Sequence, residues 1–389
     1  MAYDPYKALY LHIPFCVKRC GYCDFATAAV PRDAAAIDEY VESLVMDIRR
    51  ASKEEKLGAI ETVYLGGGTP SYIGMRRLSM LLYALSMSMH LEPEIECTME
   101  ANPESLTAPM VRDIWALGVN RLSIGVQSFD DEVLRILGRA HDAEAARAAV
   151  RAAQKRFENV SVDLMCGIPG QSAESFAESV REAVALGANH VSVYPLTIEP
   201  HTPFDAAVMA GKMPEPDEDV EAAAMEEARC ILEGAGFHRY EVASYARPGF
   251  ESRHNTAYWT GAPYLGLGRS AVTMTQNSAR RMRVQDGRVV DDLDARQMAA
   301  EDLMLGMRMA CGVSDAQVAR AAAAIDDAAS TAASSGSMTP GSEIGSVLAA
   351  FDELASLGLV KHADGRWRPT DAGWLCGNEL YGRLLDLAP

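Results

Sequence analysis

Three cysteines near the start of the chain, Cys16, Cys20 and Cys23, have the spacing of a metal site. The C-x3-C-x2-C pattern puts three thiolates on one short loop, and three thiolates can hold three irons of a cubane iron–sulfur cluster. The fourth iron would then be open to a small molecule. A zinc site would need a fourth ligand, for which His12 is a candidate, although it lies inside a predicted strand. The spacing favours a [4Fe–4S] cluster, with zinc or a chance grouping as alternatives.

The elements that must position this loop are short apolar runs separated by amphipathic stretches, a pattern that predicts parallel βαβ units. Because the first run ends just before the cysteines, the loop would lie at the carboxyl ends of the strands, where such folds gather ligands. Six units suit an α/β partial (β/α)6 barrel, with a doubly wound sheet as the alternative. The expected strands span residues 9–13, 62–65, 95–99, 121–125, 161–165 and 191–195, and the expected helices span residues 34–50, 75–89, 109–116, 143–155 and 172–186.

The second half of the chain is less regular. Residues 218–233 predict an acidic helix, and residues 250–293 predict a compact loop-and-strand region. Residues 321–346 are rich in alanine and serine and predict an exposed linker or loosely ordered insertion. Two helices flanking a strand-like run, from 347 to 385, predict a small winged-helix-like module. We therefore expect a barrel core at 1–200, a barrel extension at 201–295 and a C-terminal helical or winged-helix-like domain at 296–389.

Composition and charge exclude several classes of protein. The formal net charge is −18, so a basic footprint for nucleic acid is absent, and an anionic membrane surface would repel most of the chain. No apolar run approaches the roughly 20 residues of a spanning helix, and the N-terminus lacks a signal-peptide pattern. We expect a cytoplasmic protein with neither nucleic-acid binding nor stable membrane insertion. The scattered cysteines are interpreted as small core hydrophobes, namely Cys97, Cys166, Cys230, Cys311 and Cys376.

Polar residues and glycines follow the predicted strands where a ligand would lie. Glycine in Gly66-Gly67-Gly68-Thr69, after the second strand, lets the backbone approach a ligand closely. A carboxylate at Glu100, ending the third strand, can accept hydrogen bonds from an amine or a ribose diol. Arg139 can pair bidentately with a carboxylate. Taken alone, each is more often an ordinary turn or a satisfied polar group. Two further polar residues lie in the fourth and fifth strands, Gln127 and Asp163.

A second motif, HNTAYW at residues 254–259, combines a histidine with two aromatic side chains. His254 has the chemistry of an axial ligand to heme iron, and the aromatic side chains can pack on a porphyrin face. The alternative is a polar–aromatic structural corner in which the histidine bonds to the backbone. The glycine-rich stretch 261–268 that follows lacks the Lys-Ser or Lys-Thr pair of a nucleotide-binding loop.

The cysteine loop resembles the radical S-adenosylmethionine (SAM) proteins. Its spacing after the first strand, with an aromatic residue before the third cysteine, is similar to that family's signature, and YLHIPFC resembles the branch of oxygen-independent coproporphyrinogen III oxidase (HemN) and the HemW heme chaperones. The likeness covers nearly the whole chain and implies a radical SAM partial barrel with a [4Fe–4S] cluster and SAM. It places the methionine half of SAM at the glycine loop. The implied cofactor contacts are Tyr10, Tyr22, Gly67, Gly68, Thr69, Glu100, Gln127, Arg139 and Asp163.

Two departures separate this chain from the oxidase. The oxidase pattern has a fourth cysteine where this chain has Phe25, and a long segment before the cluster motif, where fifteen residues precede Cys16 here. Both departures resemble the HemW branch, as does HNxxYW, which is tied there to heme binding. The resemblance implies a heme chaperone that binds heme near His254, transfers it to acceptor proteins and forms a homodimer. The alternative is a coproporphyrinogen III oxidase-like enzyme of porphyrin biosynthesis, so enzymatic activity stays open.

Overall fold

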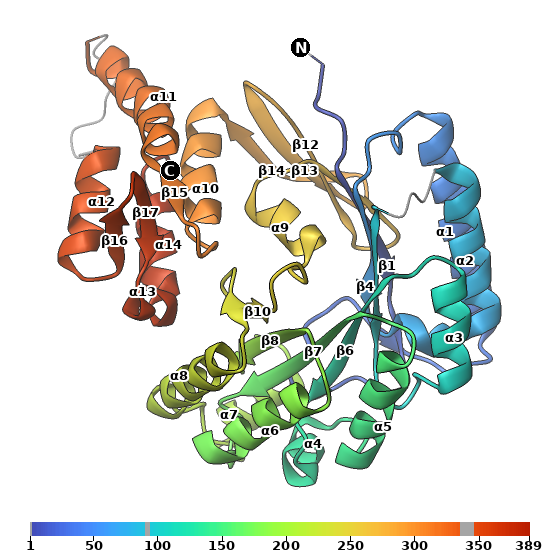
Figure 1. Ribbon diagram of the computed structural model, residues 1–389. Helices are drawn as coiled ribbons and strands as arrows, with labels where there is room; N and C mark the ends of the chain where they lie inside the picture. The colour runs from blue at the N-terminus through green and yellow to red at the C-terminus, as the bar shows by residue number, and fades with distance from the viewer. Residues whose placement is uncertain (1, 90–93, 335–345) are drawn as a thin grey trace.

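The computed structural model describes residues 2–89, 94–334 and 346–389. Six parallel strands form a curved sheet in the order β1, β4, β5, β6, β7, β8, with helices around the outside (Figure 1). The predicted α/β class, with the strands of a partial barrel, is confirmed. The six strands are β1 (Ala8–Ile13), β4 (Thr62–Gly67), β5 (Glu96–Ala101), β6 (Arg121–Gln127), β7 (Asn159–Cys166) and β8 (His190–Pro195).

The outer face of the sheet is apolar and is covered by helices. In β6, for example, Leu122, Ile124 and Val126 are fully buried in the main hydrophobic core. Burial of such side chains contributes roughly 1.5–3 kcal/mol each, which holds the helices on the sheet. All five predicted helices and the acidic helix are present, as α1 (Ala35–Lys53), α2 (Met75–Ser88), α3 (Ala108–Ala116), α5 (Ala143–Gln154), α6 (Ala173–Ala185) and α8 (Glu218–Gly234).

The inner face of the same strands is polar. Arg121, Ser123 and Gln127 alternate with the apolar residues of β6, and β5 and β7 place Glu100 and Asp163 on the same side. Successive side chains of a strand point to opposite faces, so these residues line the lumen. A barrel packed with its own apolar side chains leaves no such lining. The alternation therefore provides an interior suited to a polar ligand.

The sheet extends beyond the six strands on both sides. β11 (Tyr264–Leu267) pairs parallel with β1, while short strands β9 (His238–Arg239) and β10 (Ser244–Ala246) follow β8. The loop-and-strand prediction for residues 250–293 is right for the strands but missed α9 (Arg253–Trp259), because seven residues are too few to show helical periodicity. The antiparallel strands after β11 are β12 (Val272–Asn277), β13 (Arg280–Gln285) and β14 (Arg288–Asp294).

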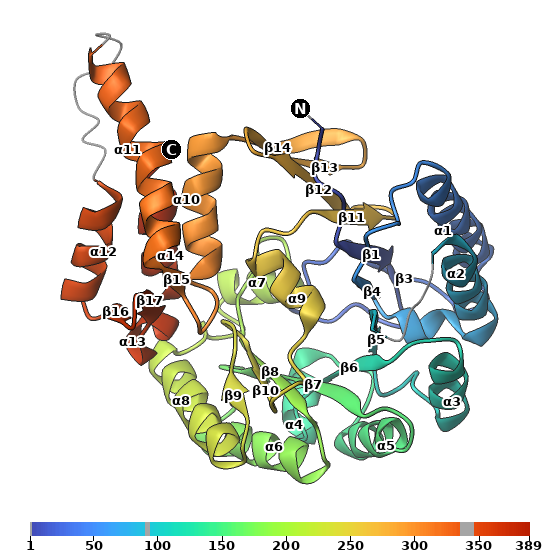
Figure 2. The same ribbon diagram turned by 45° about the horizontal axis from the view of Figure 1, so that its top comes forward.

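The C-terminal part builds a separate hydrophobic core beside the barrel (Figure 2). The two predicted helical stretches are present, and the single strand-like run predicted between them forms two strands of a three-stranded antiparallel sheet. The division of the chain at residues 200 and 295 remains our proposal. The elements are α10 (Ala295–Gly306), β15 (Val313–Ser314), α11 (Asp315–Ser334), α12 (Val347–Ser356), β16 (Val360–Ala363), β17 (Arg366–Pro369), α13 (Asp371–Leu375) and α14 (Gly377–Leu385).

The linker predicted at residues 321–346 is wrong over its first part. Residues 321–334 continue α11, because alanine is the best helix former. Ala321 and Ile325 are buried in the C-terminal core. Residues 335–345 of the predicted linker lie outside the described residues.

The interpretation of the scattered cysteines is also partly wrong. Cys97 and Cys166 are buried, but Cys230, Cys311 and Cys376 are exposed. Their apolar character alone therefore did not predict burial, because Cys97 and Cys166 lie in strands of the central sheet, whereas Cys311 and Cys376 lie in turns and Cys230 lies on α8. Among the helices of the described residues, none has both the length and the apolar character needed to cross a bilayer.

Candidate functional site

A cavity of about 300 Å³ lies at the carboxyl ends of the parallel strands, beside the cysteine loop. Eleven of the thirteen residues predicted to bind a cluster or cofactor line it. Tyr10 lines an adjoining cavity of about 520 Å³, which shares Gly67 and Glu100 with the first. His254 belongs to the lining of neither cavity. The eleven are Cys16, Cys20, Tyr22, Cys23, Gly67, Gly68, Thr69, Glu100, Gln127, Arg139 and Asp163.

The cysteine loop is anchored on both sides. Short strands β2 (Phe15–Cys16) and β3 (Ala28–Ala29) pair with each other. The Gly21 backbone N–H donates to the carbonyl of Leu137, the last residue of α4 (Asp131–Leu137), over 3.2 Å. Its own carbonyl accepts from the first turn of α7 (Pro203–Met209), and a β-carbon here would lie 2.3 Å from the Phe204 ring. Only glycine allows this close packing.

A chain of hydrogen bonds joins two of the cysteines to the strand ends. Thr69 Oγ1 donates to Cys16 Sγ over 3.5 Å and accepts from Asn102 Nδ2 over 2.9 Å. Arg139 Nη2 donates to Asn102 Oδ1 over 2.7 Å, and its Nη1 donates to Cys20 Sγ over 3.5 Å. Donors aimed at sulfur favour the thiolate form that binds iron. Asn102 was not predicted as a site residue, yet it connects the two ends of this chain.

The donors at the cavity mouth suit a cluster. Burial raises the pKa of the Cys16 and Cys23 thiols, so metal binding would release their protons. Among the described residues, no three Cys, His, Asp or Glu side chains lie close enough to hold one metal ion, whereas cubane ligands reach three separate irons. His12, the candidate fourth zinc ligand, has both ring nitrogens bonded, to the Tyr10 hydroxyl and the Ala26 carbonyl. Three thiols therefore remain as the donor set.

The glycines after β4 are required by close packing. Gly67 has φ of +110°, and a β-carbon there would lie 2.4 Å from the His12 ring. A β-carbon on Gly68 would lie 2.8 Å from the backbone nitrogen of Phe15, next to Cys16. The loop therefore lies flat against the strand that leads into the cysteines, and its backbone faces the cavity.

Glu100 holds this loop in place from the neighbouring strand. Its Oε2 accepts from the Gly67 backbone N–H over 3.0 Å, and its Oε1 accepts from the Tyr64 hydroxyl over 2.8 Å. Burial raises the pKa of Glu100 to about 7, against the opposing effect of these two bonds. Burial also raises the pKa of Asp163, whose carboxylate accepts from the Ser123 hydroxyl. Both carboxyl groups are thus acceptors facing the lumen.

Gln127 has a strained backbone. Its φ of +66° lies in the left-handed region, which costs a non-glycine residue roughly 1–3 kcal/mol. The pairing of β6 with β7 shifts register between Gly125 and Gln127, which marks a bulge. Bulges commonly re-aim a side chain beside a functional site. The strain therefore falls on a residue that was predicted to contact a cofactor.

His254 is buried, and both of its ring nitrogens have side-chain partners. The side chain is 1% exposed, and burial lowers its pKa to about 3. Nδ1 lies 2.8 Å from Thr62 Oγ1, and Nε2 lies 3.1 Å from the Tyr258 hydroxyl. The ring stacks on Tyr64 at 4.9 Å. These contacts resemble the structural-corner alternative, with side chains rather than backbone as the partners, and heme contact by His254 stays a prediction.

The other residues of the HNxxYW motif lie at the two cavities and at the C-terminal core. Asn255 lines the cavity that the cysteines line, and Tyr258 lines the adjoining one. Trp259 Nε1 donates to Glu241 Oε2 over 3.1 Å, and its ring packs against the C-terminal core. The motif thus connects the cavities to the C-terminal part. Asn255 is a site residue that the prediction missed, although its place in the motif was a signal.

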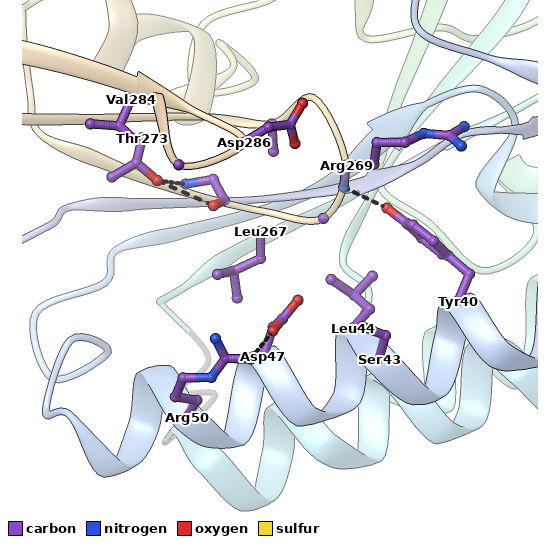
Figure 3. Close-up of a pocket in the computed structure, with 14 residues that line it drawn as sticks. Tyr40, Ser43, Leu44, Asp47, Arg50, Leu267, Arg269, Thr273, Val284 and Asp286 are labelled. Atoms are coloured by element: carbon purple, nitrogen blue, oxygen red, sulfur yellow. Dashed lines mark hydrogen bonds and ion pairs between the residues drawn. The ribbon is translucent and has the colours of Figure 1, made fainter. Parts of the chain in front are cut away.

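A further hollow, about 520 Å³, lies outside the barrel between α1 and the strands after β11 (Figure 3). Tyr40 spans it, because its hydroxyl accepts from the Arg269 backbone N–H over 3.1 Å. Asp47 and Arg50 pair on the helix side. None of the predicted cluster, cofactor or heme residues lines this hollow, so the candidate site is the lumen cavity.

The fold and this cavity define a radical SAM protein. The sequence model of the Radical SAM superfamily matches residues 10–183. Among solved structures, coproporphyrinogen III oxidase (HemN) from Escherichia coli superposes with a TM-score of 0.76 at 22% identity, covering 98% of this chain and 90% of that one. At this identity the likeness shows the fold.

Similar proteins of known name indicate the branch of radical SAM proteins to which the chain belongs. "Heme chaperone HemW" from Bacillus subtilis (strain 168) is 31% identical over 394 residues, covering 97% of this chain and 99% of the relative. The protein of the same name from Synechocystis sp. is 34% identical over 333 residues, covering 80% of each chain. The chain belongs to the HemW family of radical SAM proteins.

Proposed function

We propose that this protein is a heme chaperone that carries a [4Fe–4S] cluster and SAM, binds heme and passes it to heme-accepting proteins. The observation that carries the proposal is the shared cavity, which both the cysteine loop and Asn255 of HNxxYW line. Relatives named as heme chaperones across nearly the whole chain support it. Phe25, at the position of the oxidase's fourth cysteine, agrees with this family.

The site residues would fall into cluster ligands, donors to the cluster sulfurs and cofactor contacts. Cys16, Cys20 and Cys23 would hold three irons, with Arg139 and Thr69 as donors to two of the sulfurs. The bound cluster and SAM would supply radical or redox chemistry, while the protein supplies binding and orientation. The remaining cofactor contacts are proposed for the residues predicted from sequence, Tyr10, Tyr22, Gly67, Gly68, Glu100, Gln127 and Asp163.

In this proposal His254 supports the wall of the lumen. Both of its ring nitrogens are bonded, and its ring backs Tyr64, which donates to Glu100. Ligation of heme iron by His254 would cost these bonds. We therefore place heme contact in the cavities that α9 borders.

Anaerobic reconstitution followed by hemin titration tests the proposal. Wild-type protein should take up iron and sulfide in a brown cluster and bind hemin with a Soret band. Cys20→Ala should lose cluster iron, while Cys230→Ala, an exposed cysteine outside the site, should keep it. Stoichiometric zinc without iron uptake would refute the cluster assignment.

The alternative, a coproporphyrinogen III oxidase-like enzyme, is favoured by the same cavity beside the cysteines. An anaerobic assay with coproporphyrinogen III, SAM and a reductant separates the two functions. We expect no protoporphyrinogen, and measurable formation would overturn our preference.

Three associated properties are also proposed. A tight cysteine cluster suits a reducing compartment, which agrees with a cytoplasmic location. The net charge of −18 supports partners other than nucleic acid. Homodimer formation is suggested by the family, and light scattering of the reconstituted protein tests it.

A further inference from the structure

Arg121 is a buried cation at the floor of the lumen cavity. It is the first residue of β6 and therefore lies at the opposite end of that strand from Gln127. Its side chain is 2% exposed, yet it belongs to the cavity lining, together with Ser192 and Asn255. The guanidinium thus faces the cavity from below, while the cysteines lie at the mouth.

This guanidinium has no protein partner among the residues that the structure describes. Its Nε is buried without a hydrogen bond, and no carboxylate oxygen of those residues comes within 4.0 Å of it. Asp163, the carboxylate that shares the lumen, accepts instead from the hydroxyls of Ser123 and Ser161. Burying an unpaired charge is costly. An anionic ligand would offset that cost.

The other groups around Arg121 do not neutralise it. His190 bonds Ser161 and Tyr240 through its two ring nitrogens, and burial, with the Arg121 charge adding to it, lowers the pKa of this histidine. His254 is neutral for the same reasons. Tyr64 donates its hydroxyl to Glu100. The floor therefore carries a guanidinium without a hydrogen-bonded counter-ion among the described residues, while Asp163, whose charge reaches Arg121 only through space, is bound by hydroxyl groups.

Arginine presents parallel N–H donors that match a carboxylate. Two other arginines line the cavity: Arg19 lies on the cysteine loop, and Arg139 already bonds Asn102 and the Gly125 carbonyl at the mouth. The methionine carboxylate of SAM belongs at that mouth, beside the glycine loop. A carboxylate at the floor must come from a second molecule.

We propose that Arg121 binds a propionate carboxylate of the heme, an inference that rests on the proposed function. Tyr194, near the carboxyl end of β8, lines the same cavity and is 41% exposed, so the lumen opens at its mouth. Ser192 and Asn255 line the same cavity and offer a hydroxyl and an amide donor. The propionate, rather than the iron, then anchors the heme in the barrel.

Hemin and hemin dimethyl ester, in which both carboxylates are blocked, test this assignment. Anaerobically reconstituted wild type should bind hemin about tenfold or more tightly than the ester, as expected for a charge-assisted bond. Arg121→Met should bind both ligands alike, at the wild-type affinity for the ester. Arg121→Lys, which keeps the charge without the paired donors, should restore part of the preference. Arg77→Met is the matched control, because Arg77 is also buried but pairs with Asp38 outside the cavity.

The outcomes separate this inference from the proposed function. If wild type binds neither ligand, both fail. If wild type binds hemin and Arg121→Met keeps the full preference, the propionate site alone is wrong. A loss of SAM affinity in Arg121→Met with the preference intact also overturns it, because the guanidinium would then serve SAM. If the methionine variant does not fold, the lysine variant decides: a reduced preference supports the site and an unchanged one refutes it.

Discussion

Replacing Glu100 by glutamine should change how stability depends on pH. Burial raises the pKa of this carboxyl group from its usual 4.5 to about 7 in the folded protein. Between those values the folded state holds a proton that the unfolded chain has lost. Stability therefore falls as pH rises through this window and stays lower above it. At 1.36 kcal/mol for each unit of pKa, the free energy of unfolding should fall by up to about 3 kcal/mol.

Glutamine removes the ionisation while keeping the contacts. Its amide oxygen can accept from the Gly67 backbone N–H, and its amide nitrogen can donate to the Tyr64 hydroxyl, which is both donor and acceptor. The variant without cofactors should therefore match wild type near pH 4.5 and exceed it by up to about 3 kcal/mol near pH 8.

Urea unfolding of the cofactor-free protein across this pH range measures the difference. Glu158→Gln, at an exposed position, serves as the control and should run parallel to wild type. A Glu100→Gln curve that also runs parallel to wild type would show that Glu100 ionises as it does in water, and the buried-acceptor argument would fail.

Three more substitutions test separate contacts. Gly68→Ala should lower SAM affinity at least about tenfold in equilibrium titration, because its β-carbon would meet the Phe15 backbone; Gly58→Ala, with open space around it among the described residues, should not. Asn102→Ala should speed cluster loss to a chelator, followed by absorbance, by breaking the bonds to Thr69 and Arg139; unchanged loss would refute its linking role. His254→Ala should lower the urea-derived stability by roughly 2–3 kcal/mol, with hemin affinity of the folded fraction retained; selective loss of hemin binding would restore the ligand hypothesis.

Much of the fold was predictable from the sequence, because the patterns that specify the strands and the cysteine loop are local. The six strands of the barrel core are runs of apolar residues, and such runs are buried wherever a parallel sheet forms. The C-x3-C-x2-C spacing places Cys16, Cys20 and Cys23 on one loop irrespective of the rest of the fold. The resemblance to radical SAM proteins then supplied the positions that line the cavity.

The missed residues depend on contacts between distant segments. Asn102 acquires its role only when Thr69, after β4, and Arg139, after α4, come close to it in the fold. The environment of His254 was missed as well, because its ring hydrogen-bonds to Thr62, 192 residues away in sequence, and no local pattern shows that contact. Arg121 had a readable signal, since polar residues alternate with Leu122 and Ile124 along β6 and so share the lumen face.

Heme transfer tests the central claim most directly. Reconstituted protein loaded with one equivalent of hemin would be mixed with an apo heme-accepting protein, and the Soret bands followed over time. We predict that the loaded protein retains heme alone and loses it to the acceptor faster than through free solution, at a rate that rises with acceptor concentration. A rate independent of acceptor concentration, equal to spontaneous dissociation, would contradict the chaperone function.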